Sequence, residues 1–155
     1  MTNFDTTNVT NMANMFRGCS KITDVNVSVF DTSKVTDMTC MFYCCSLLSS
    51  INLTNFDTTN VTNMYAMFAE CSKLTNLKLN NWNVEKLTNV DNMLLRCTSL
   101  KEIDFSLVNS ATYEKNIFKT MLGQLGNITF YVKDSECKTL LETIKPNATV
   151  KIKSV

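Results

Sequence analysis

The chain has 155 residues, of which 45% are hydrophobic, and its 15 basic and 14 acidic residues give a formal net charge of +1. This length is typical of one domain with a sizeable core, and the balanced charge argues against long-range attraction to nucleic acid or to an anionic membrane. The sequence contains no histidine, which removes the commonest general base and metal ligand at neutral pH, and no apolar run reaches the ~18 residues of a membrane-spanning helix.

A repeat of 26 residues organises most of the chain. Aromatic residues recur at this spacing at Phe4, Phe30, Phe56 and Trp82, and cysteines recur at Cys19, Cys45, Cys71 and Cys97. The segment from Phe4 to Met12 returns unchanged as Phe56 to Met64. Because the copies keep one register without insertions, the sequence predicts supersecondary units that stack by translation.

Within each unit, the apolar spacing predicts a short helix followed by a strand. In the third unit, positions i, i+3, i+4 and i+7 of one helical face are Met64, Met67, Phe68 and Cys71. A threonine precedes each such segment, at Thr10, Thr36, Thr62 and Thr88, and its hydroxyl is expected to cap the helix. Leu77 and Leu79 then alternate with polar residues, which predicts a strand whose leucines face the core.

A shorter fifth unit and a closing unit follow. The fifth helix is predicted from Phe118, Met121 and Leu122, and the fifth strand from Leu125, Ile128 and Phe130. In the closing unit, Asp134 is expected to cap a helix that carries Cys137, Leu140, Leu141 and Ile144, before a sixth strand with Val150 and Ile152. Stacking of all units predicts an α/β fold with a parallel sheet on one face and short helices on the other.

The amino-acid sequence of the repeat resembles that of a known family. The pattern Leu74-x-x-Leu77-x-Leu79-x-Asn81-Trp82, preceded by Met67-Phe68-x-x-Cys71-Ser72, is similar to the BspA-like leucine-rich repeats of surface proteins. The resemblance implies a right-handed leucine-rich-repeat solenoid of about five to six rungs over residues 1–132, with a capping helix and strand over residues 133–155. It also implies a cell-surface or secreted protein that adheres to host proteins or to other cells, without catalytic residues.

The cysteine and aspartate columns each allow a structural and a metal-binding interpretation. The four repeated cysteines are expected to form a packed ladder of thiols, with disulfides or a metal as alternatives. Cys40 and Cys44 are expected to be exposed thiols, and the cysteines leave a cytoplasmic location open. Asp5, Asp31 and Asp57 are expected to form turns by accepting from a backbone N–H two residues on, with calcium as the alternative.

The outer face of the sheet is the best candidate for binding, because stacked strands present a flat array of side chains. We expect a ligand to contact Asn52, Asn76, Lys78, Glu102 and Asp104, with an acidic spot at the last two residues. A surface of this kind suits weak or multivalent binding. The alternative is that the face is only solvated.

The sequence therefore favours a non-catalytic protein-interaction or adhesion module, with a structural spacer as the alternative. No nucleophile–base pair, phosphate-binding loop or metal-ligand set is recognisable, so we expect neither an enzyme nor a cofactor. The expected partner is a protein. The N-terminal edge, which begins before the first predicted helix, is expected to be covered by further repeats or by a second copy in a homodimer.

Overall fold

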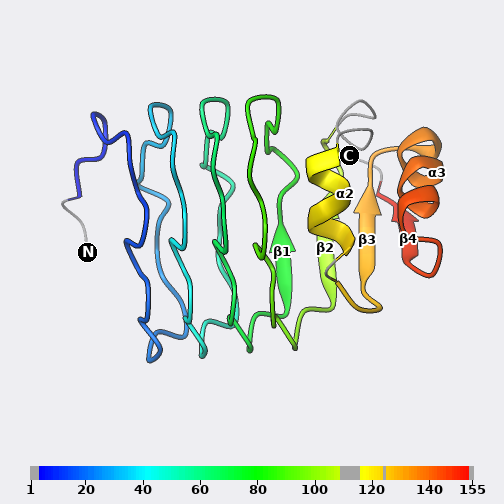
Figure 1. Ribbon diagram of the computed structural model, residues 1–155, viewed down its shortest axis with the longest axis horizontal. Coiled ribbons are helices and arrows are strands. Elements are labelled where there is room, and N and C mark those ends of the chain that lie inside the picture. Colours follow the sequence, from blue (N-terminus) through cyan, green and yellow to red (C-terminus); the bar gives the residue numbers. More distant parts are fainter. Residues whose placement is uncertain (1–3, 109–115, 124, 154–155) are drawn as a thin grey trace.

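The computed structural model of the protein describes residues 4–108, 116–123 and 125–153 (Figure 1). In chain order its elements are β1 (Asn76–Lys78), β2 (Glu102–Phe105), α2 (Asn116–Gly123), β3 (Thr129–Val132), α3 (Ser135–Ile144) and β4 (Thr149–Ile152). The four strands form one sheet in the order β1-β2-β3-β4, and each neighbouring pair is parallel. The predicted parallel sheet is thus confirmed for the third unit onward.

The strand register places one row of apolar side chains on the buried side of the sheet. Leu77 pairs with Ile103, Ile103 with Phe130, and Phe130 with Val150. All four side chains are buried, which is the outcome expected of alternating residues on a half-buried strand. Ile152, predicted as part of the last strand, lies in β4 but is 51% exposed.

The first four units lie side by side as successive coils of similar outline (Figure 1). Equivalent residues of neighbouring units touch: the rings of Phe16 and Phe42 are stacked with centroids 5.3 Å apart, and those of Phe42 and Phe68 are 5.4 Å apart. Met38 and Met64, which share another column, are fully buried. The methionine and phenylalanine columns are therefore core, because translation by one unit brings each residue onto its own copy.

The short helices predicted in these four units are wrong. Residues 12–19, 38–45, 64–71 and 90–97, which we call the turn ribbon, form consecutive turns instead. In the third unit Ala66 and Glu70 have φ angles of 52° and 65°, values that interrupt a right-handed helix. The N–H of Met67 donates to the carbonyl of Met64, and the N–H of Ala69 to that of Ala66, each three residues back. Two such turns in succession place the same side chains inward as a short helix does.

Two further local predictions also fail. The threonines do not cap helices: both the N–H and the hydroxyl of Thr62 donate to the carbonyl of Thr36 in the preceding unit, at 2.9 and 3.1 Å. Residues 22–28 and 48–54 contain no strand, although strands were expected there. In these units the carboxamides of Asn26 and Asn52 accept from the backbone N–H two residues on, which forms a turn at the end of each segment.

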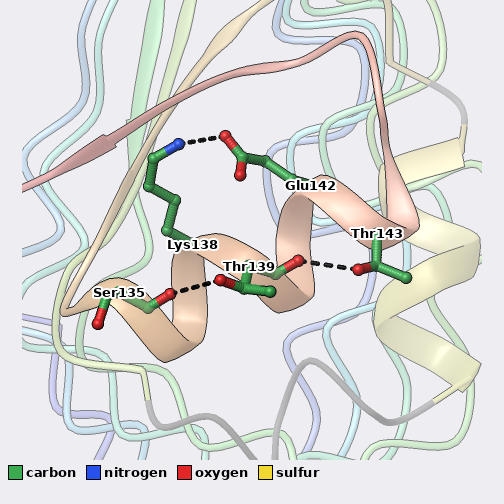
Figure 2. A network of polar contacts seen from close by, with 5 residues as sticks. All are labelled: Ser135, Lys138, Thr139, Glu142 and Thr143. Atoms are coloured by element: carbon green, nitrogen blue, oxygen red, sulfur yellow. Dashed lines mark hydrogen bonds and ion pairs between the residues drawn. The ribbon is translucent and has the colours of Figure 1, made fainter.

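The C-terminal elements agree with the sequence. Asp134 caps α3, because its Oδ1 accepts from the N–H of Cys137 at 2.9 Å. Figure 2 shows the polar face of this helix, where Lys138 pairs with Glu142 and two threonine hydroxyls donate to carbonyls one turn back. In α2, Met121 and Leu122 are buried as predicted. Phe118 also belongs to α2, but its side chain lies outside the described residues.

Candidate functional site

The outer face of the sheet carries a row of charged and aromatic side chains at its C-terminal end. The register pairs Lys78 with Asp104, Asp104 with Tyr131, and Tyr131 with Lys151. Side chains that are direct partners on parallel strands lie on the same face. A cation, an anion, an aromatic ring and a second cation therefore follow one another across the four strands.

A shallow hollow of about 340 Å³ opens along this row. It is lined by Asn76, Leu77, Lys78, Glu102, Asp104, Tyr131 and Lys153. The structure thus brings together four of the five residues predicted from the sequence. The fifth, Asn52, lies apart, at a smaller hollow of about 260 Å³ beside Asn26. Its carboxamide oxygen accepts from the N–H of Thr54 at 3.1 Å and from the Thr54 hydroxyl at 2.8 Å.

Asp104 is the anchored member of the hollow. Although it belongs to the outer face, it is only 7% exposed. Its Oδ2 accepts from the Lys153 ammonium at 2.5 Å, and its Oδ1 accepts from the N–H of Ser106 at 2.9 Å. Burial by itself would raise the pKa of the Asp104 carboxyl, but the hydrogen bonds from Lys153 and Ser106 outweigh burial and lower that pKa below its ordinary value. Asp104 is therefore an ionised, engaged carboxylate at neutral pH.

Some of the remaining polar groups of the hollow already make hydrogen bonds or contacts within the protein, and others do not. The Tyr131 hydroxyl donates to Glu102 Oε1 at 3.3 Å, and the ammonium groups of Lys151 and Lys153 lie 5.9 and 6.0 Å from the Tyr131 ring centroid. Lys78 is exposed, and within the part of the chain that the structure describes no group accepts a hydrogen bond from its ammonium. Lys78 is therefore the cation that remains available to a ligand.

Sequence reasoning missed Tyr131 and Lys153 as members of the site. Strand alternation places Tyr131 on the outer face, like Asp104, so this signal could have found it. Lys153 follows β4, and its partner Asp104 lies two strands away in β2. Only the register of β4 against β3 and of β3 against β2 brings these residues together, and that register is not written in a local motif.

The repeated cysteines form the expected packed column. The Cys71 thiol donates to the carbonyl of Phe42 and the Cys97 thiol to that of Phe68, at 3.2 and 3.1 Å. Burial raises the pKa of Cys45 to about 11 and that of Cys97 to about 12, so these thiols stay protonated. The predicted exposure of Cys40 is wrong, since it is 8% exposed: it belongs to the turn ribbon and packs in a small apolar cluster.

The aspartate column forms turns as predicted. The N–H groups of Thr7, Ser33 and Thr59 donate to the side chains of Asp5, Asp31 and Asp57 at 2.9–3.0 Å. The hydroxyls of Thr7 and Ser33 also donate to Asp5 and Asp31, and these bonds, followed by the backbone bonds, lower the pKa values of the two carboxyls. Across residues 4–108, 116–123 and 125–153, no cluster of three or more His, Cys, Asp or Glu side chains has an arrangement that would hold a metal ion.

Among the described residues, neither helix has the length and apolar character needed to cross a bilayer. No curated protein and no solved structure matches the chain. Residues 1–121 match a family described as Mycoplasma protein of unknown function, DUF285, which carries a different name from the BspA-like family that the repeat wording resembles. Because the match spans more than half of the sequence and includes all four well-formed repeats, the chain belongs to this Mycoplasma protein family, DUF285.

Proposed function

We propose that the protein is a leucine-rich-repeat solenoid related to the BspA-like proteins, and that it binds a protein ligand on the outer face of its sheet at the cell surface. The observation that carries the proposal is the hollow of about 340 Å³ around Lys78, Glu102 and Tyr131. An aromatic ring flanked by cations, beside an available ammonium, offers the residue types that anchor protein interfaces.

The chemistry of the hollow supports binding rather than catalysis. Its two carboxylates are already engaged, Asp104 with Lys153 and Glu102 with Tyr131. A general base needs a carboxylate that is free to accept a proton from a substrate. The groups left for a partner are the Lys78 ammonium and the oxygen of the Asn76 carboxamide, whose Nδ2 donates to the Thr75 hydroxyl at 3.2 Å. They suit a partner that presents an acidic or carbonyl-rich segment across β1 and β2.

Adhesion of beads coated with the protein to cultured host epithelial cells tests this proposal. Lys78→Ala and Asn76→Ala should each reduce adhesion, and loss of an interface anchor corresponds to roughly a tenfold weaker interaction. Lys73→Ala is the matched control, because Lys73 is also exposed but does not line the hollow. Raised salt should weaken adhesion of the unchanged protein, since an exposed ammonium is screened.

A spacer that only holds other modules apart gives a different result. Its adhesion, if any, would be equal for the unchanged protein and for the Lys78→Ala, Asn76→Ala and Lys73→Ala variants. Equal adhesion of all three variants would therefore refute binding through this face. Matching circular dichroism spectra and melting temperatures would show that the variants remain folded, which is expected for exposed positions.

A further inference from the structure

The turn ribbon is directional, and this property leads to a second site. In the third unit, the N–H groups of Ala66, Phe68 and Glu70 donate to carbonyls of the fourth unit at 2.8–2.9 Å. The same relation joins the first unit to the second and the second to the third, for example from Phe16 N–H to the Met41 carbonyl at 2.8 Å. Every second N–H of the ribbon therefore points toward the C-terminal end of the stack.

The ribbon ends at the fourth unit, where these donors have no acceptor among the described residues. The equivalent N–H groups belong to Asn92, Leu94 and Arg96, and within the described part of the chain no group accepts from them. The intervening N–H groups are satisfied inside the unit, as that of Leu95 donates to the carbonyl of Asn92 at 3.0 Å. The positions one repeat further on form α2 (Asn116–Gly123). Only the first carbonyls of so short a helix are used inside it, but among the described residues no carbonyl of α2 accepts from the fourth ribbon.

A hollow of about 340 Å³ lies beside this unused edge. Leu94 and Arg96 form one side of it, and Leu125 and Ile128, between α2 and β3, form the opposite side. Its apolar wall is buried, with Leu94 at 2% and Ile128 at 6% exposure. The hollow therefore combines an apolar wall with Leu94 and Arg96, two of the three residues whose N–H groups lack an acceptor among the described residues, and its size lies at the lower end of the range of small-molecule sites.

We infer that this hollow, between the fourth repeat and the segment that joins α2 to β3, binds a small organic carboxylate with an apolar body. A carboxylate only accepts hydrogen bonds, which matches an edge that only donates. Arg96 adds positive charge at the rim. Its guanidinium also pairs with Glu70 at 2.9 Å and is 70% exposed, so the backbone donors contribute more than its charge does. The apolar body lies against Leu94 and Ile128. A free fatty acid and the C-terminal carboxylate of an apolar peptide share this chemistry.

Titration of the isotope-labelled protein with sodium octanoate, followed by amide NMR, tests the site. The amide protons of Leu94 and Arg96 should move downfield and saturate, because they form new charge-assisted hydrogen bonds. Octan-1-ol, which has the same apolar body without the charge, should leave them nearly unmoved. N-acetyl-leucyl-leucine serves as the peptide probe, and its affinity relative to octanoate identifies the source of the carboxylate.

Gly126 provides a matched pair of variants, because it lines the hollow and a Cβ there meets no heavy atom within 4 Å. Gly126→Phe fills the space and should weaken octanoate binding by about tenfold or more, whereas Gly126→Ala should bind like the unchanged protein. Asparagine suits the φ of 59° at position 96. Arg96→Asn should therefore weaken octanoate binding only about two- to threefold, because the attraction that is lost, between the Arg96 guanidinium and the ligand carboxylate, lies in solvent.

Three results would overturn the inference: no movement of the Leu94 and Arg96 amides with either acid, equal movement with octan-1-ol, or unchanged affinity in Gly126→Phe. Should Gly126→Phe not fold, the amide shifts of the unchanged protein decide the matter without it. The site lies away from Lys78 and Tyr131, so Lys78→Ala should leave octanoate binding intact.

Discussion

Two alanines of the third turn ribbon provide a direct test of its backbone. Ala66 and Ala69 are both buried, at 3% and 0% exposure, and both pack in the same small apolar cluster. Ala66 has a φ of 52°, whereas Ala69 is not among the residues with positive φ. Replacing each with glycine removes the same methyl group and adds the same freedom to the unfolded chain. The two substitutions therefore differ only in the backbone conformation that glycine enters.

The magnitudes follow from that difference. Loss of a buried methyl group costs about 0.8 kcal/mol, and the added freedom of the unfolded chain costs about 0.4–1 kcal/mol. Ala69→Gly should therefore lower the free energy of unfolding by about 1–2 kcal/mol. Ala66→Gly carries the same costs, but it also relieves a left-handed conformation that costs a residue with a Cβ roughly 1–2 kcal/mol. Its free energy of unfolding should stay within about 0.5 kcal/mol of that of the unchanged protein.

Urea denaturation followed by circular dichroism measures both values by linear extrapolation. The expected outcome is a difference of at least about 1 kcal/mol between the variants, with Ala66→Gly the more stable. In an α-helix the two glycines would each cost about 1 kcal/mol. Equal destabilisation by Ala66→Gly and Ala69→Gly would therefore refute the turn ribbon and restore the helix predicted from the apolar spacing.

Three other predictions concern single groups. Lys153→Met should raise the pKa of Asp104 in a carboxyl NMR titration and lower the free energy of unfolding by about 1 kcal/mol at neutral pH. In the unchanged protein the stabilisation by this pair is present above the ordinary aspartate pKa and is lost as pH falls through the lowered pKa of Asp104. A pKa of Asp104 that does not change in Lys153→Met would contradict the pair. Asp134→Ala should lower the melting temperature at pH 7, because the Asp134 carboxylate accepts from the N–H of Cys137, and this hydrogen bond lowers the pKa of Asp134. The loss should shrink as pH falls through that lowered pKa, and a loss that does not change with pH would exclude the cap. A thiol reagent should modify the half-buried Cys44 in the native protein before the fully buried Cys71, because burial raises the pKa of the Cys71 thiol. Peptide mass mapping that finds Cys71 modified first would contradict the packed column.

The columns were predictable from the sequence because they depend on translation alone. If residue i touches residue i+26, then Phe42 stacks on Phe68 whatever the local backbone does. The local backbone was not predictable in the same way. The spacing from Met64 to Cys71 fits one short helix and also fits two consecutive turns. The sequence did contain a sign of turns, because Gly18 and Asn92, residue types that tolerate positive φ, occupy the two left-handed positions of the ribbon.

The candidate site on the sheet was predictable to the extent that it follows strand alternation. Asn76 and Lys78 face outward for the same reason that Leu77 faces inward. The burial of Asp104 was not predictable, because it depends on the ammonium of Lys153, 49 residues further along the chain. Interactions between unlike units leave no periodic trace in the sequence. Sequence reasoning therefore locates a face but does not reveal which of its charges are already paired.

The two candidate sites share a structural origin, which is the loss of exact repetition, in the strand column at the third unit and in the turn ribbon after the fourth. In one column, Asn26 and Asn52 close turns with their own backbone, and their side chains are thereby occupied. The same column continues as Lys78, which is free of such a bond, and as Asp104, which keeps the bond to the N–H two residues on and also pairs with Lys153. On the other side, α2 ends the ribbon while the sheet continues. Exact repeats satisfy each other's polar groups, so unsatisfied donors and available charges accumulate where the repeats diverge. Restoring the repeat at one position, by Lys78→Asn, should therefore close the local turn and remove the available charge together, whereas Lys78→Ala removes only the charge.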